Sequence, residues 1–199
     1  MTGFAHEVIS RTERYRGPVF TVVTDRVTMP GGGAANRDYL LHVGAVGVVA
    51  LDDDGRVALI GQYRHAVGGR LWELPAGLRD VEGEDLAVGA LRELAEEADL
   101  RARTVDVLLD LHTSPGCTNE QIRIFLARDL SPVPDAERHD RTDEEADIEL
   151  RWVPLDDAIA MVFAGEITNA AAVGGLLAAA RARDAGWASL RASDTPTLA

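Results

Sequence analysis

Three carboxylates are concentrated in residues 92–97 (RELAEE), a segment with the composition of a helix interior. In a helix, Glu93, Glu96 and Glu97 occupy positions i, i+3 and i+4, so their side chains share one face. Like charges at this spacing destabilise an isolated helix by about 0.2–0.5 kcal/mol per pair. Oxygen ligands at this density are typical of Mg²⁺ or Mn²⁺ sites rather than zinc sites. The segment predicts a divalent-metal site, with a solvated acidic helix face as the alternative.

An amphipathic helix must carry these carboxylates. Its other side has an apolar stripe at helical spacing, formed by Ala87, Ala90, Leu91, Leu94 and Ala98. We expect the helix to begin near Asp85, because Glu84 and Asp85 suit the positive N-terminal end of a helix. Residues 71–77 (LWELPAG) precede it and predict a short strand that leads into a turn.

The remaining segments alternate between strand and helix patterns. Residues 15–27 predict a strand or a short hairpin, and residues 36–42 predict a second strand. The apolar run 44–51 predicts a central strand, joined by the turn at 52–55 to a returning strand in a hairpin. Further strands are predicted at 57–63, 105–111, 121–127 and 148–153, and helices at 154–164 and 169–183.

Length and charge limit the kinds of protein that this chain can be. The 199 residues suit one domain of about 150 residues with appendages. Hydrophobic residues make up 46% and charged residues 27%, as in ordinary soluble globular proteins. The formal net charge of −13 argues against nucleic acid as a partner, because nucleic-acid-binding proteins usually carry a basic stripe.

Cysteine usage and the absence of targeting signals predict a cytoplasmic location. The single Cys117 excludes an internal disulfide and a cysteine-rich metal site. The first residues, MTGFAHEVIS, lack the basic and apolar regions of a secretory signal. No apolar run approaches the length of about 20 residues that spans a bilayer, so we expect no membrane partner.

Residues 77–100 resemble the Nudix box, G-x5-E-x7-REUxEExGU, in which U is an aliphatic residue. Gly77 opens the box, Glu84 follows, and the residues from Arg92 onward come at the seven-residue gap. Two departures stand out, because six residues separate Gly77 from Glu84 and Asp99 replaces the closing glycine. Aspartate can adopt the left-handed conformation usual after a helix, at a cost of roughly 1–2 kcal/mol.

The resemblance implies an α/β fold, the Nudix α/β/α sandwich with a mixed sheet and an N-terminal antiparallel strand extension. It covers about residues 15–183. The implied organisation is a strand extension at 1–42, a Nudix hydrolase domain at 43–185 and a flexible tail at 186–199. In the ADP-ribose branch of this family the extension forms a homodimer, so a homodimer is expected here.

Other residues narrow the resemblance to the ADP-ribose branch of the Nudix family. The lead-in at 73–77 (ELPAG) is similar to that of its ADP-sugar enzymes, and Pro115 lies sixteen residues past Asp99, as in that branch. The extra residue before Glu84 is similar to the actinobacterial members. In this branch the general base comes from the loop before the strand at 148–153. Glu145 is its implied counterpart and Glu144 the reserve, with a solvated acidic cluster as the alternative.

The resemblance also implies a set of site residues. Mg²⁺ (or Mn²⁺) would be held by Glu93, Glu96, Glu97 and the backbone carbonyl of Ala76, and Glu84 would pair with Arg92 across the loop. The implied catalytic residues are Glu93, Glu97 and Glu145. The implied substrate-binding residues are Arg64, Glu73, Phe20, Arg37, Pro115 and Glu120. Phe20 and Arg37 would stack the adenine from the partner subunit. Without the resemblance, the strand pattern predicts only that Arg37 faces either a ligand or solvent.

The implied function is hydrolysis of the diphosphate bond of ADP-ribose, or a related ADP-sugar, to AMP and ribose 5-phosphate. The partner is then a small nucleoside diphosphate sugar. One alternative keeps the fold and changes the substrate to another nucleoside diphosphate derivative or a dinucleotide. A second alternative is a Nudix-like module that senses a ligand without turnover.

Overall fold

The computed structural model describes residues 6–142 and 146–197. The chain forms two compact units, of which the first comprises Met1–Gly44 and His112–Gln121. The second unit comprises Ala45–Leu111 and Ile122–Ala199. Within the described ranges no helix is long and apolar enough to cross a membrane.

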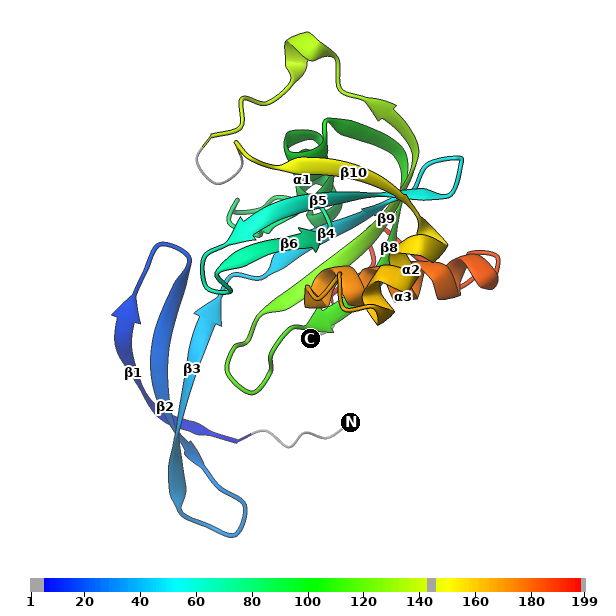
Figure 1. Ribbon diagram of the computed structural model, residues 1–199. Coiled ribbons are helices and arrows are strands. Elements are labelled where there is room, and N and C mark those ends of the chain that lie inside the picture. The colour runs from blue at the N-terminus through cyan, green and yellow to red at the C-terminus, as the bar shows by residue number, and fades with distance from the viewer. Residues whose placement is uncertain (1–5, 143–145, 198–199) are drawn as a thin grey trace. The chain divides into compact units, whose positions relative to one another are not determined.

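The first unit is built on a three-stranded antiparallel sheet, drawn in blue in Figure 1. Its strands are β1 (Val8–Arg16), β2 (Phe20–Thr28) and β3 (Ala34–His42). The N-terminal antiparallel extension is thereby confirmed. Of the two alternatives predicted for residues 15–27, the short hairpin is confirmed, because this range spans the end of β1, the turn after it and most of β2. Strand β1 escaped prediction because all nine of its residues are exposed, so it carries no buried apolar face.

A loop from the middle of the chain adds to this unit at the edge of β3. The backbone N–H of Leu40 donates to the Cys117 carbonyl at 2.9 Å, and that of Asn119 donates to the Leu40 carbonyl at 3.3 Å. The Asn119 side chain accepts from the His42 N–H at 2.8 Å. The segment that carries Pro115 is therefore hydrogen-bonded to the N-terminal strands.

The second unit contains two sheets. The larger sheet is mixed, because β4 pairs with β9 in parallel and with β7 in antiparallel orientation. Its strands, in spatial order, are β11 (Arg191–Ala192), β8 (Leu100–His112), β9 (Gln121–Pro132), β4 (Ala45–Ala50) and β7 (Ala76–Leu78). The smaller sheet has the order β10 (Glu149–Pro154), β5 (Arg56–Arg64) and β6 (Gly69–Glu73).

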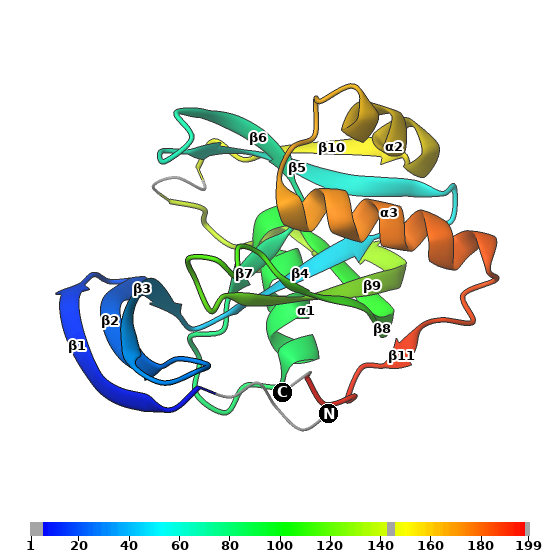
Figure 2. The same ribbon diagram turned by 90° about the horizontal axis from the view of Figure 1, so that it is seen from below.

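Helices cover both faces of the larger sheet, with α1 on one face and α3 on the other (Figure 2). Their bounds are α1 (Leu86–Ala98), α2 (Leu155–Phe163) and α3 (Ala170–Asp184), with a short 3-10 turn at Asp135–Glu137. Neighbouring residues of β9 point to opposite cores, since Phe125 packs with Leu94 of α1 and Ile124 packs with Leu176 of α3. The predicted α/β/α sandwich with a mixed sheet is confirmed.

The predicted hairpin between the runs 44–51 and 57–63 is wrong. Only an isolated bridge joins Leu51 to Val57, and β5 belongs to the smaller sheet. Both edges of β4 are already occupied, by β9 and by β7. The turn between the two runs therefore redirects the chain into the second sheet instead of folding it back.

A buried ion pair lies between β8 and β9. Arg123 donates from Nε and Nη2 to the two carboxylate oxygens of Asp110, at 2.7 and 3.1 Å. Arg191 of β11 donates to the same carboxylate at 3.0 Å. Burial opposes ionisation of Asp110, but the hydrogen bonds from the two arginines outweigh it and hold the pKa of this carboxyl below its ordinary value.

The C-terminal segment completes the hydrogen bonding of this pair. Arg123 also donates to the backbone carbonyls of Thr195 and Pro196. The sequence predicts a flexible tail over 186–199, whereas in the structure Arg191, Thr195 and Pro196 bond to the buried ion pair. A buried guanidinium needs such partners, because an unmet donor away from water is costly.

Ending the chain after Leu190 removes Arg191 and both carbonyls that Arg123 binds. The buried pair then loses three hydrogen bonds, and we expect the free energy of unfolding to fall by about 2–4 kcal/mol. Urea unfolding followed by tryptophan fluorescence measures the change. A chain ending after Pro196 keeps all three bonds and should match the full-length protein. Equal stability of the two shortened chains would contradict this role of the tail.

Candidate active site

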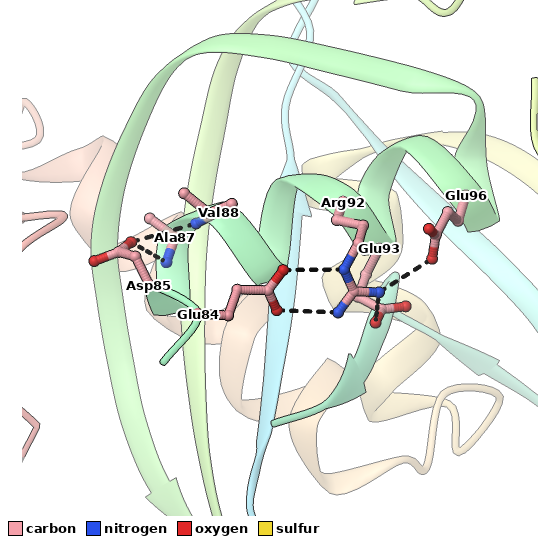
Figure 3. A network of polar contacts seen from close by, with 7 residues as sticks. All are labelled: Glu84, Asp85, Ala87, Val88, Arg92, Glu93 and Glu96. Carbon is pink, nitrogen blue, oxygen red and sulfur yellow. Dashed lines mark hydrogen bonds and ion pairs between the residues drawn. The ribbon is translucent and has the colours of Figure 1, made fainter. Parts of the chain in front are cut away.

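Helix α1 has aspartates at both ends. Asp85 is the N-cap, and its carboxylate accepts the N–H groups of Ala87 and Val88 at 2.9 and 3.3 Å (Figure 3). Asp99 is the C-cap in the left-handed conformation (φ 54°, ψ 36°), with its N–H bonded to the Leu94 carbonyl. The predicted start of the helix and the predicted conformation of Asp99 are both confirmed.

One guanidinium collects the carboxylates around α1. Arg92 donates to both oxygens of Glu84, at 3.2 and 3.1 Å, which confirms the implied pair across the loop. It also donates to Glu93 at 2.7 Å and to Glu96 at 3.2 Å (Figure 3). The hydrogen bonds to Glu84 contribute most to raising the pKa of Arg92 above its ordinary value. Arg92 therefore stays charged, and three carboxylates share its single positive charge.

Two glycines make room for these carboxylates. A Cβ on Gly77 would lie 2.1 Å from the carboxyl carbon of Glu93. A Cβ on Gly89, within α1, would lie 2.7 Å from an oxygen of Glu84. The glycine that opens the box is thus required by the position of the Glu93 carboxylate. The need for Gly89 was missed from the sequence, where it reads only as a weak helix former.

Glu97 is the most buried of the three helix carboxylates, at 4% exposure. One of its oxygens accepts the Ala76 N–H at 2.8 Å, which ties the helix to β7. The carboxylate therefore lies beside the residue whose carbonyl is the implied fourth metal ligand. A buried carboxylate at this place requires compensating groups close by.

The donor set fits a hard divalent cation. Glu84, Glu93 and Glu96 bring three negative charges to one guanidinium, and Glu97 adds a fourth carboxylate on the same helix. Carboxylate oxygens in excess of the local positive charge favour Mg²⁺ or Mn²⁺. Within the described residues, no three acidic, histidine or cysteine side chains already stand close enough to hold a metal ion.

Two implied substrate-binding residues lie together on β5 and β6. Arg64 donates from Nε and Nη2 to the two oxygens of Glu73, at 2.9 and 2.8 Å. The Glu73 side chain is 5% exposed, whereas that of Arg64 is 41% exposed. A bidentate pair of this kind fixes the plane of the guanidinium. Glu73 thus orients an arginine that remains accessible from solvent.

Two further implied residues belong to the sheet of the first unit. Phe20 is exposed at the start of β2, and Arg37 is exposed on β3. The Arg37 guanidinium donates to the Asn36 carbonyl at 2.9 Å and contacts the Met29 sulfur at 3.4 Å. These contacts hold Arg37 against its own sheet and leave its predicted role in substrate binding untested.

The last two implied substrate residues lie in the loop of the first unit. Glu120 accepts a hydrogen bond from the Thr113 hydroxyl at 2.5 Å and lies 3.7 Å from the His42 ring. Pro115 borders a cavity of about 350 Å³ within this unit. The cavity is lined by Tyr39, His112, Pro115, Thr118 and Asn119.

The implied base, Glu145, and its reserve, Glu144, lie outside the described residues. Earlier in the same loop, sequence reasoning missed Arg141, whose Nε donates to the Glu96 carbonyl at 2.8 Å. Arg141 also pairs with the Asp99 carboxylate at 2.7 Å. The available signal was the pair Arg138 and Arg141, three residues apart inside an otherwise acidic stretch.

Comparison with known families agrees with this geometry. The model of the NUDIX domain family matches residues 41–172, more than half of the chain. The chain therefore belongs to the Nudix family.

Individual relatives extend over most of the chain. It is 46% identical to the ADP-ribose pyrophosphatase of Mycobacterium tuberculosis (strain ATCC 25618 / H37Rv) over 95% of this chain and 89% of that protein. It is 32% identical to the ADP-ribose pyrophosphatase of Bacillus subtilis (strain 168), over 85% and 90%. A solved structure titled "Crystal structure of ADP compounds hydrolase" has the same fold, with a TM-score of 0.76 and 21% identity over 91% of this chain and 96% of that one.

Replacing Gly77 by alanine should disturb the carboxylate site without unfolding the protein. The added Cβ meets the far end of the Glu93 side chain, which can swing away at little cost to the fold. We expect Mn²⁺ affinity, measured by calorimetry, to fall by about 10–100-fold, as for other disturbed metal surroundings. The free energy of unfolding should change by less than about 1 kcal/mol.

Gly116→Ala is the matched control, because a Cβ there meets nothing within 4 Å. That variant should bind Mn²⁺ like the unmodified protein. Unchanged Mn²⁺ binding in Gly77→Ala would mean that Glu93 takes no part in holding the cation.

Proposed function

We propose that this protein is a Mg²⁺-dependent (or Mn²⁺-dependent) hydrolase that cleaves the diphosphate bond of ADP-ribose, or a related ADP-sugar. With ADP-ribose as the substrate, the products are AMP and ribose 5-phosphate. The observation that carries the proposal is the carboxylate face of α1, with Glu84 and Arg92 paired across its loop. It occurs in a chain that is similar, along nearly its whole length, to curated ADP-ribose pyrophosphatases.

The metal ligands in this proposal are Glu93, Glu96, Glu97 and the Ala76 carbonyl. When bound, the cation supplies a Lewis acid for the phosphoryl oxygens and a water of lowered pKa. The protein contributes rigidity, because Glu97 is buried and hydrogen-bonded to β7. Arg92 contributes compensating charge, since its guanidinium keeps neighbouring carboxylates together before a cation binds.

Arg64 binds the diphosphate in this proposal. Its guanidinium is accessible and its plane is fixed by the buried Glu73 carboxylate, so little freedom is lost when a phosphate docks. Glu73 acts through Arg64. The remaining substrate contacts, to the adenine and the ribose, are assigned to Phe20, Arg37, Pro115 and Glu120.

A cytoplasmic homodimer is the proposed form of the enzyme. Strand β1 supports an interface, because apolar side chains such as Val8, Ile9 and Tyr15 are about half exposed on it. In the described part of the chain, β1 pairs with β2 and with no other strand. Exposed edge strands of this kind are usually covered by another chain or element.

A panel of nucleotide derivatives tests the proposed function. With Mg²⁺, we expect the protein to convert ADP-ribose to AMP and ribose 5-phosphate, measured by chromatography of the products. Glu97→Gln should lower kcat/KM at least about a hundredfold, because roughly 3 kcal/mol of transition-state stabilisation is lost with a ligand charge. Chelation with EDTA should abolish turnover.

The panel also separates the alternatives. Turnover of nucleoside triphosphates or dinucleotides alone would move the protein to another Nudix substrate class. Binding of ADP-ribose without turnover, in the presence of Mg²⁺ and Mn²⁺, would instead indicate a ligand-sensing module.

The general base is assigned to Glu145. Glu145→Gln should lower kcat for ADP-ribose by about 10²–10⁴-fold, the usual contribution of a general base, with KM little changed. The adjacent Glu144→Gln is the matched control and should retain kcat. A large loss in Glu144→Gln alone would reassign the base to that residue, and full activity in both variants would exclude this pair.

A further inference from the structure

Asp99 connects α1 to the loop that precedes β10. Its N–H caps the helix at the Leu94 carbonyl, and its own carbonyl accepts the Val133 N–H at 2.8 Å. Its carboxylate lies 2.7 Å from an Nη of Arg141 and 3.9 Å from Nε of Arg138. The residue that replaces the closing glycine of the box thus uses its backbone and its side chain to hold one segment.

Arg141 also contacts the C-terminal end of α1 directly. Its Nε donates to the Glu96 carbonyl at 2.8 Å while its Nη lies against Asp99. Both side chains are partly buried, where an ion pair is screened less than on the surface. The C-terminal end of a helix also attracts a cation, because its last carbonyls carry partial negative charge.

Residues 133–141 form a loop whose two ends both contact Asp99. Val133, which is buried, and Arg141 both meet Asp99, so residues 133–141 begin and end at the same point of the fold. A third tether joins its middle to β8, where Arg101 pairs with Glu137 at 2.5 Å. The segment is therefore fixed to the metal-binding helix at both ends.

A glycine at position 99 could not make this connection. The left-handed conformation costs aspartate roughly 1–2 kcal/mol relative to glycine. The ion pair with Arg141 uses atoms that glycine lacks. The departure from the box therefore adds a strained residue together with a contact between α1 and the loop.

We propose that Asp99 and Arg141 form a clamp that positions the loop before β10 on the carboxylate helix, and with it the general base. Arg141 stands four residues before Glu145 in the sequence, so the clamp fixes to α1 the part of the loop that precedes that residue. The proposal rests on the proposed function for the identity of the base. Asp99 and Arg141 are positioning residues, since neither is assigned a contact with substrate.

Kinetics of Asp99→Gly and Arg141→Gln test the clamp. Glycine suits the left-handed conformation, so Asp99→Gly should fold as stably as the unmodified protein. We expect each variant to lower kcat for ADP-ribose about tenfold, with KM changed less than about threefold. The double variant should be no slower than Arg141→Gln alone, because that substitution already removes the only contact that Asp99→Gly removes from the Arg141 side chain. Arg141→Lys should recover part of the activity.

The same two substitutions in a Glu145→Gln background show how the clamp acts. If it positions Glu145, they cause no further loss of kcat once that carboxylate is gone. A tenfold loss that persists in this background, or additive losses in the double variant, would overturn the positioning role. Unchanged kcat in both single variants would overturn it as well.

Hydrogen exchange tests the clamp without activity. Amide exchange of residues 134–142, followed by mass spectrometry, should accelerate about tenfold in Asp99→Gly and Arg141→Gln. Arg183→Gln is the matched control, because it breaks an ion pair of 2.8 Å with Asp156 elsewhere in the same unit. Exchange that stays unchanged in the clamp variants would overturn the proposal. If the unmodified protein fails to cleave ADP-ribose, the proposed function is wrong. The amide exchange of residues 134–142 still tests the clamp in that case, because it does not depend on activity.

Discussion

The carboxylates on α1 impose the main constraint on the second unit, because negative charge is gathered where water is partly excluded. Arg92 offsets part of this negative charge, because its one guanidinium pairs with Glu84, Glu93 and Glu96. The backbone at position 77 also passes so close to the Glu93 carboxylate that a Cβ would collide with it, which explains the glycine there. The negative charge left over is what makes the helix suited to a divalent cation.

The layers of the fold serve this arrangement by holding α1 from two directions. Its apolar side packs through Leu94 against Phe125, in the core on one face of the mixed sheet. Its acidic side is fixed to β7 by the hydrogen bond between the Ala76 N–H and Glu97. A helix fixed in this way presents its carboxylates in one geometry, so a cation that binds there need not order the backbone first.

How far the sequence predicts the structure depends on the range of the interactions. The start of α1 near Asp85 and the left-handed Asp99 were predictable, because the signals at helix ends are decided within a few residues. The partners of β4 were not, since a strand chooses its neighbours among segments far apart in the chain. Arg141 was missed for the same reason, because its contact with Asp99 spans more than forty residues.

The two departures from the Nudix box are absorbed in different ways. The extra residue before Glu84 lies in a loop where Gly83 takes a positive φ of 78°, and Glu84 still reaches Arg92. This change is local, because the pair of Glu84 with Arg92 forms in spite of the longer loop. Asp99 instead keeps the backbone conformation of the missing glycine and gains a distant partner. A departure that costs strain and gains a contact adds a new constraint to the site, whereas the extra loop residue leaves the pair of Glu84 with Arg92 intact.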